Sequence, residues 1–485
     1  FGTMNVKAAV TITTDPSRRG TTDTNSYYIT NQSTLTINGV VPGDQLSAYK
    51  VLDAYYNQTS NAITYEFTED FQNFLASSST YRDLTVDEYY QLTSGNITSG
   101  STQTESTLDT LVSAYATYIK NNSVSGTAMS MNGTVATLTA DAGVYLVLPT
   151  QTMRVYAVMV GNLDFVASGS DWNLNTATIV AKVSEVGINK TLEGGEQEGS
   201  FGIGENITFV IQATVPKFPT NAINRVYTIH DTLSAGLTFG SVNDVTIRDG
   251  STPLTISGNN ITDSSSHVIG TIAMEGQQLT INFTGIQYIA SNNITITYQA
   301  ELNDSAVLGS AGNSNSATLT YSNDPYGDGT STTAPSEVFV YTYGLEIFKY
   351  YNSGDSRIGL SNAVFDVFSD AGLKNKVGSI KTETDGYDRI SGLKAGTYYI
   401  KEVTAPTGYA LLSGTLEVEI TNDNSDTGTL AGYHLESIPN TKIGSLPSTG
   451  GIGAILYLTL GIGLMVGAVV FIVIYRKKKL GKQNS

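Results

Sequence analysis

The clearest indication of the fold class is the stretch Ile207-Thr208-Phe209-Val210-Ile211-Gln212-Ala213-Thr214-Val215. Every odd-numbered residue in it is apolar, whereas Thr208, Gln212 and Thr214 are polar. Because successive side chains of a strand point to opposite faces, one face would enter a core and the other would meet water. The stretch therefore predicts one strand of a half-exposed β-sheet.

The same alternation recurs farther along the chain. Residues 279–283 and 294–298 repeat it, with Gly and Asn turn residues between the two runs. Several short alternating strands joined by turns are typical of a β-sandwich. We therefore predict a middle sandwich domain over residues 186–323.

A third domain is expected after a linker. Residues 322–335 are rich in Ser, Asp, Gly and Thr and show no periodicity, which favours a linker. Strand-like runs resume at 345–349, 363–368 and 415–420. A domain over residues 340–442 has the size of one immunoglobulin-like sandwich.

The first domain, residues 1–180, is less uniform. Apolar residues recur at helical spacing between Leu108 and Ile119, behind a capping pair formed by Ser106 and Asp109. We expect a β-domain that carries one or two helices. The predicted fold class is thus mainly all-β, with tandem immunoglobulin-like sandwiches.

The composition excludes several classes of protein. Cysteine is absent, so disulfides and thiolate metal sites are excluded. The net charge of -17 argues against nucleic acid as a partner. His230, His267 and His434 are widely separated, and Asp324 and Asp328 lack the spacing of an EF-hand loop. No convergent catalytic set is visible, so we expect no enzymatic activity, no cofactor and no metal.

The C-terminal region predicts a membrane span. Residues 451–475 carry no charge and are rich in Leu, Ile, Val and Gly, which is long enough for a transmembrane helix. Basic residues follow from Arg476 onward, and the positive-inside rule places them in the cytoplasm. Residues 1–450 would then lie outside the cell. A plain single-span anchor is one interpretation of this arrangement.

A second interpretation uses the residues directly before the span, which are Leu446-Pro447-Ser448-Thr449-Gly450. This pentapeptide, the span and the basic tail together resemble the sorting signal of Gram-positive surface proteins, which sortase transpeptidases recognise. The resemblance implies cleavage between Thr449 and Gly450 and transfer of the Thr449 acyl group to an amine. Sortase and peptidoglycan would be partners, and the mature protein would lie at the cell wall.

An internal motif extends the resemblance. The segment Tyr398 to Tyr409, preceded by Gly392 to Gly396, looks like the E-box of CnaB-type domains. With three domains and a sorting signal, the exported chain is similar to the backbone (major) pilins of sortase-assembled pili. The resemblance implies a pilus shaft subunit, joined covalently to neighbouring subunits and serving adhesion to a host receptor. A singly anchored adhesin, or a minor or base pilin that uses these domains as a stalk, is the alternative.

The resemblance also implies internal cross-links. In such domains a lysine near the start forms an isopeptide bond with an asparagine near the end, assisted by a carboxyl group. Burial would neutralise the lysine and raise the pKa of the acid, which can then polarise the amide. In the third domain the matching residues are Lys349, Glu402 and Asn440.

The middle domain offers a second set, Lys190, Asp231 and Asn315, with Asn313 and Asn323 as competitors for the asparagine role. In the first domain, Gly143 to Pro149 resembles the E-box strand, but no glutamate follows it. We therefore assign no bond there and expect the first domain to be the least stable.

The lysine that would link subunits is expected between the first two domains. Backbone pilins carry it in a motif like Trp, a few residues, then Val-Tyr-Pro-Lys-Asn. This chain has Trp172, a strand-like run and Lys182, but Tyr-Pro and the Asn are replaced. Lys182 is the candidate, and an ordinary solvated lysine at a strand end is the alternative.

Overall fold

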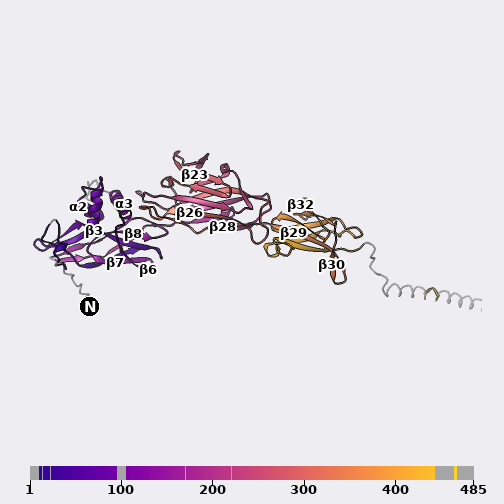
Figure 1. Cartoon of the computed structure of the whole chain (residues 1–485), viewed down its shortest axis with the longest axis horizontal. Coiled ribbons are helices and arrows are strands. Elements are labelled where there is room, and N and C mark those ends of the chain that lie inside the picture. Colours follow the sequence, from indigo (N-terminus) through magenta and orange to yellow (C-terminus); the bar gives the residue numbers. More distant parts are fainter. Residues whose placement is uncertain are drawn as a thin grey trace, which may run out of the picture. The chain divides into compact units, whose positions relative to one another are not determined.

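The computed structural model describes residues 10–442, apart from 14, 22, 95–104, 170 and 220, together with 464–466. The chain divides into two compact units. Unit 1 comprises the chain up to Gly199 with Gly204–Ser305 and Asn313–Val340, and unit 2 comprises Ser200–Ile203, Ala306–Gly312 and the chain from Tyr341. Strands dominate both units (Figure 1), which confirms the predicted all-β class.

The N-terminal part of unit 1 has three layers (Figure 1). Its middle layer is a six-stranded sheet around the long strand β3 (Gln45–Asn57), with β1 (Ser26–Tyr28), β4 (Ala62–Phe67), β5 (Thr127–Ala128), β8 (Gly143–Gln151) and β10 (Met159–Leu163). Three helices cover one face: α1 (Glu69–Ser77), α2 (Val86–Thr93) and α3 (Glu105–Asn121). The other face packs on a sheet with the order β13 (Ala177–Val180), β2 (Gln32–Asn38), β7 (Val135–Asp141), β6 (Ser130–Asn132).

Two small ladders complete this part of the chain. One joins β11 (Phe165–Ser168) to β12 (Asp171–Leu174), and the other joins β9 (Val155–Tyr156) to β14 (Val183–Ser184). In the second ladder, Val183 and Ser184, directly after Lys182, pair with Tyr156 and Val155 of the N-terminal part.

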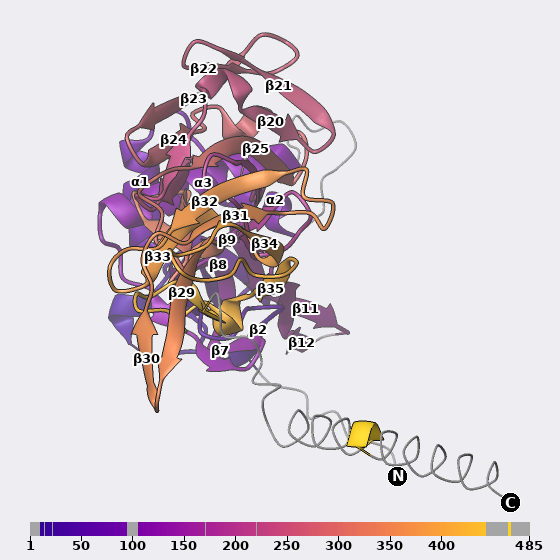
Figure 2. The same ribbon diagram turned by 90° about the vertical axis from the view of Figure 1, so that its right-hand side faces the viewer.

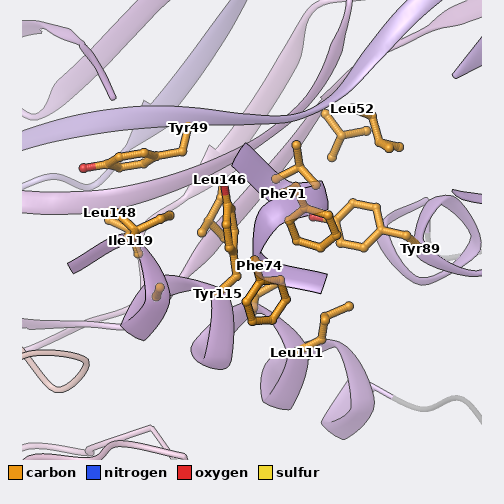
Figure 3. Close-up of a cluster of buried hydrophobic side chains, with 14 of the residues drawn as sticks. Tyr49, Leu52, Phe71, Phe74, Tyr89, Leu111, Tyr115, Ile119, Leu146 and Leu148 are labelled. Carbon is orange, nitrogen blue, oxygen red and sulfur yellow. The ribbon is translucent and has the colours of Figure 1, made fainter. Parts of the chain in front are cut away.

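An aromatic core lies between the helices and the six-stranded sheet (Figure 3). Phe71, Phe74 and Tyr115 meet there, and the Phe71 and Tyr115 rings pack edge to face with centroids 4.7 Å apart. The helix predicted over residues 108–119 is confirmed as part of α3. The prediction of one or two helices was too low, because α1 and α2 also form.

The rest of unit 1 is a 14-stranded sheet. The first half of β21 pairs with β20 and the second half with β22, so this strand joins two halves of the sheet. One half contains β15 (Ile188–Leu192), β17 (Asn206–Thr214), β19 (Leu237–Phe239), β20 (Thr246–Asp249), β21 (Thr252–Ser257) and β25 (Asn293–Leu302). The other contains β22 (Asn260–Thr262), β23 (Val268–Glu275), β24 (Gln278–Asn282), β18 (Tyr227–Leu233), β26 (Asn313–Ser322), β27 (Thr330–Thr332), β28 (Ser336–Tyr341) and β16 (Glu198–Ser200).

The alternation predicted for residues 207–215 is confirmed in β17. Ile207, Phe209, Ile211 and Ala213 are buried, whereas Gln212 is exposed. The predicted linker, in contrast, is folded: β27 within it pairs with β26, and Tyr326, which lies between these two strands in the sequence, is buried. The composition of residues 322–335 marked local turns correctly but gave no sign of this packing.

Unit 2 is a sandwich of two four-stranded sheets. One sheet contains β30 (Ser356–Gly359), β29 (Tyr343–Ser353), β33 (Tyr387–Leu393) and β36 (Tyr433–Pro439), and β29 and β30 form a long hairpin (Figure 2). The other has the order β32 (Lys376–Lys381), β31 (Val364–Phe368), β34 (Gly396–Thr404), β35 (Leu416–Ile420). Leu345 and Ile347 of the first sheet share a buried core with Phe365 and Ile400 of the second.

The predicted pentapeptide 446–450, and nearly all of the predicted span 451–475, lie outside the described residues. Within the part of the chain that the structure describes, no helix combines the length and the apolar character that a membrane crossing requires.

Candidate functional site

Lys190, Asp231 and Asn315 meet in the interior of unit 1. Lys190 lies on β15, in one half of the 14-stranded sheet, and the other two residues lie on β18 and β26 in the other half. The Lys190 Nζ atom lies 2.6 Å from each carboxylate oxygen of Asp231. All three side chains have no solvent exposure, so the structure brings the predicted set together in a buried site between the two halves.

Tyr298 on β25 is a fourth member of this site. Its hydroxyl donates a hydrogen bond to Asp231 and accepts one from Lys190 Nζ at 2.6 Å and one from Asn315 Nδ2 at 2.7 Å. Burial raises the pKa of Tyr298 well above its ordinary value, so the phenol keeps its proton. The phenol oxygen therefore bridges the amine and the amide.

Burial changes the ionisation of this site. Burial lowers the pKa of Lys190 from 10.5 to about 8, although Asp231 acts in the opposite direction. The carbonyl oxygen Oδ1 of Asn315 is buried and has no hydrogen-bond partner within the described residues. A polar atom left in this way is costly unless chemistry or a further partner uses it.

The competing asparagines are engaged elsewhere. The Asn313 amide donates to the Val340 carbonyl oxygen at 3.1 Å, and the Asn323 amide donates to the Thr152 carbonyl oxygen at 2.7 Å. Asn315, in contrast, shares the phenol of Tyr298 with Lys190. The geometry therefore favours Asn315 for the asparagine role.

Unit 2 contains a comparable site. Lys349 lies on β29 and Glu402 on β34, in the two facing sheets, and Lys349 Nζ lies 3.2 Å from Glu402 Oε1 with both side chains buried. Burial lowers the pKa of Lys349, and Glu402 opposes this shift. The second oxygen of Glu402 accepts the Leu412 N–H at 2.6 Å, which fixes the carboxyl group.

Asn440 directly follows β36, and the carbonyl oxygen of the preceding Pro439 accepts a hydrogen bond from Lys349 Nζ at 3.4 Å. In the parallel ladder Lys349 is opposite Ile438, and the Asn440 N–H donates to the Tyr350 carbonyl oxygen at 2.8 Å. Residues two apart on a strand share a face, so Asn440 follows Ile438 on the face that Lys349 occupies. Its Nδ2 atom is buried without a hydrogen-bond partner among the described residues.

The first domain holds its strand-centre lysine differently. Lys50 on β3 lies 2.9 Å from an Asp53 carboxylate oxygen and 2.8 Å from the Tyr28 hydroxyl. The side chain keeps 17% of its exposure, and an ordinary ion pair accounts for its position.

Lys182 lies between β13 and β14, and it is exposed. Its carbonyl oxygen accepts the Ala157 N–H at 3.0 Å, which extends the β9–β14 ladder. The side chain lines a surface cavity of about 410 Å³ with Ile179, Phe218, Tyr326 and others. Lys182 is thus an exposed lysine at the edge of a cavity with mixed polar and apolar lining.

A strap formed by residues 321–329 joins the middle domain to the first domain. Tyr321 donates its hydroxyl to the Met153 carbonyl oxygen, and Asp324 pairs with Lys120 at 3.0 Å. Tyr326 is 2% exposed and belongs to the aromatic core of the first domain. Hydrogen bonds from Ser113 and the Val158 backbone reach its phenol, while burial raises its pKa to about 12.

Sequence reasoning missed Tyr298 and the strap. Tyr298 does occupy an inward position of the alternation in residues 294–298, which is the one signal that could have drawn attention to it. For Tyr326, a lone aromatic residue in a turn-rich segment was such a signal.

Comparison with protein families gives three matches. Residues 203–325 match the Gram-positive pilin backbone subunit 2, Cna-B-like domain. Residues 348–432 match a prealbumin-like fold domain, and residues 438–479 match the LPXTG cell wall anchor motif.

Individual relatives agree with these matches. The chain is 25% identical over 388 residues to the trypsin-resistant surface T6 protein of Streptococcus pyogenes serotype M6, across 62% of this chain and 70% of that protein. The solved T6 backbone pilin of that serotype has the same fold, with a TM-score of 0.66 and 21% identity over 85% of this chain and 99% of that one. The full-length major pilin SpaD from Corynebacterium diphtheriae gives a TM-score of 0.53 and 18% identity over 86% of this chain and 98% of that one.

These matches account for the two β-rich units and for the C-terminal signal. They also place the mature chain outside the cell, at the cell wall. The chain contains a pilin-backbone Cna-B-like domain, a prealbumin-like domain and an LPXTG cell wall anchor motif, and it is similar to the backbone pilins of Gram-positive bacteria.

Proposed function

We propose that this chain is the repeating shaft subunit of a sortase-assembled pilus, with two internal isopeptide bonds and with Lys182 as its linking lysine. Sortase would cleave after Thr449 and hold the threonyl group as a thioester. The Lys182 amine of the next subunit would attack that carbonyl and form the link between subunits. The last acyl group would pass to peptidoglycan, and the assembled shaft would serve adhesion.

The single observation that carries this proposal is the buried Lys190 site. Nζ, in its neutral form, attacks the side-chain carbonyl carbon of Asn315 while Asp231 and Tyr298 polarise the amide and hand over protons. A carbon–nitrogen bond forms to Lys190, the bond to the original amide nitrogen breaks, and ammonia leaves. Lys349, Glu402 and Asn440 would react in the same way in unit 2.

These bonds suit a shaft under tension. Force applied at Lys182 would reach Lys190 within eight residues of chain, cross the bond to Asn315, and continue to Lys349 and Asn440. Residues 190–315 and 349–440 would be bypassed, so pulling could not unfold them. Residues before Lys182 would carry no load, which is consistent with a first domain that has no cross-link.

The test is an immunoblot of wall extracts boiled in SDS, from cells that express the whole chain. The expected result is a ladder of covalent polymers that depends on sortase and on Thr449. A single band at the monomer mass would contradict the shaft proposal and would favour a singly anchored adhesin.

A further inference from the structure

We propose that Lys217 is a second acceptor amine, able to receive the Thr449 acyl group of another copy of this chain. The inference rests on the proposed function, because it uses the same sortase acyl-enzyme as donor. It concerns a different lysine, in the loop after β17.

The backbone of Lys217 is hydrogen-bonded to β14, the strand that directly follows Lys182 in the sequence. Its N–H donates to the Ser184 hydroxyl at 3.1 Å, and the next N–H, that of Phe218, donates to the Pro216 carbonyl oxygen at 3.1 Å. Pro216 also restricts the backbone directly before the lysine. Lys182 lies two residues before Ser184, and its carbonyl oxygen extends the β9–β14 ladder, so the backbone of Lys217 is held two residues from Lys182 along this ladder.

Both lysines are available in a way that the other described lysines of unit 1 are not. Lys50 pairs with Asp53, Lys120 pairs with Asp324 at 3.0 Å, and Lys190 is buried. Lys182 and Lys217 are exposed, and neither forms an ion pair within the described residues. A carboxylate partner stabilises the protonated amine, so an unpaired lysine is the better nucleophile.

The surface around Lys217 also suits an incoming peptide. Lys217 lines a cavity of about 450 Å³ together with Pro216, Ile286 and Ile289. Phe218 and Pro219 line both this cavity and the one that contains Lys182. The donor segment carries Leu446 and Pro447 three and two residues before the reacting Thr449, and burying their apolar surface against Pro216, Ile286 and Ile289 favours binding.

The chemistry is the same at either amine. Neutral Nζ attacks the thioester carbonyl of Thr449, the carbon–sulfur bond breaks, and the sortase cysteine leaves as a thiolate that takes up the amine proton. A subunit acylated at both lysines would carry two chains. Lys217 would therefore allow branches in the polymer and would sustain assembly when Lys182 is lost.

The experiment compares the whole chain with Lys182→Ala, Lys217→Ala and the double variant, all expressed in the native cell. Lys374→Ala is the matched control, because Lys374 is exposed but lies in unit 2. Polymers are resolved on boiled SDS gels, then digested and sequenced by mass spectrometry for branched peptides. We expect branches at both lysines in wild type, weaker ladders in each single variant, and loss of the ladder in the double variant.

Three outcomes would overturn the inference. One is a ladder lost completely in Lys182→Ala, with no branched peptide at Lys217 in wild type. Another is a ladder that persists in the double variant, which would also remove Lys182 from its proposed role. The third is failure of wild type to polymerise, which would overturn the shaft proposal itself and can be told apart from the first two.

Discussion

Lys190 Nζ lies 2.6 Å from both carboxylate oxygens of Asp231, and neither side chain has any solvent exposure. Burying an ion pair of this kind costs free energy, because both groups lose hydration that their mutual attraction restores only in part. Conversion of Lys190 to an amide removes the lysine charge permanently. The proposed bond thus gives a reason for a lysine in the middle of a β-sandwich core.

The bonds predict a deficit in mass. The purified ectodomain that ends at Thr449 should weigh less than its sequence by two ammonia molecules, one for each bond. Asp231→Ala should restore one of them and Glu402→Ala the other, since each removes the carboxyl group beside its lysine. Intact-mass spectrometry measures this directly.

Asp263→Ala is the control for that measurement, because Asp263 binds only a surface histidine among its charged neighbours. It should keep the wild-type deficit. Full sequence mass for the wild type would mean that neither bond forms.

Tyr298 should control how fast the middle-domain bond forms. Its hydroxyl contacts Lys190, Asp231 and Asn315 together, so Tyr298→Phe removes the bridge but keeps the ring. We expect slower loss of ammonia in this variant, followed by mass spectrometry at intervals after expression is induced. Tyr288→Phe, at an exposed tyrosine, should behave as wild type. A wild-type rate in Tyr298→Phe would leave the phenol with no role in the reaction.

The sequence predicted the participants of these sites more fully than their surroundings. The alternation in β17 could be predicted because its period of two residues is visible in the local sequence. The two buried lysines, Lys190 and Lys349, were found through the family motifs. Tyr298 was missed because an inward-facing tyrosine on a strand has the same sequence pattern whether it fills a core or touches a reactive amide. Only the packing of β25 against β15, β18 and β26 distinguishes the two cases.

Short helices and the strap escaped prediction for a different reason. Helices α1 and α2 are each about two turns long, so tertiary packing supplies most of their stability. A local signal was present in the capping box of Thr85 and Glu88, which begins α2. Turn-forming residues between Ser322 and Pro335 indicated where the chain reverses, but burial of Tyr326 depends on a surface that is distant in sequence.

The pKa of Lys190 predicts how stability depends on pH when the bond is absent. Asn315→Ala leaves an unreacted Lys190 whose pKa is about 8 when folded and near 10.5 when unfolded. Between these values the unfolded chain binds more protons, so stability should rise with pH across that window. The expected gain is on the order of 3 kcal/mol, measured by urea denaturation at the two ends.

Wild type is the control for this effect, because the proposed bond would make its Lys190 an amide that does not titrate. Tyrosines and other groups that titrate in the same window contribute to both proteins, so the difference between them isolates the lysine. An equal pH response in both proteins would contradict the lowered pKa.

Tyr326 should determine the stability of the first domain, although it belongs to the middle one. Tyr326→Ala removes a ring from the core that contains Phe71 and Tyr115, which should cost about 3–5 kcal/mol. Trp172, the single tryptophan of the chain, packs in the first domain and reports its unfolding by fluorescence. We expect the Trp172 transition to fall to lower temperature or denaturant concentration.

Two further variants separate the contribution of the Tyr326 ring to stability from that of its hydroxyl, and control for nonspecific effects of losing a tyrosine. Tyr326→Phe keeps the ring and loses the hydrogen bonds from Ser113 and Val158, so it should cost only about 1–2 kcal/mol. Tyr288→Ala, which removes a tyrosine that is 48% exposed, should leave the Trp172 transition in place. If Tyr326→Ala also left the Trp172 transition unchanged, the stability of the first domain would be independent of the strap. A lowered transition would instead show that the first domain, to which we assign no cross-link, takes part of its stability from a neighbour proposed to have one.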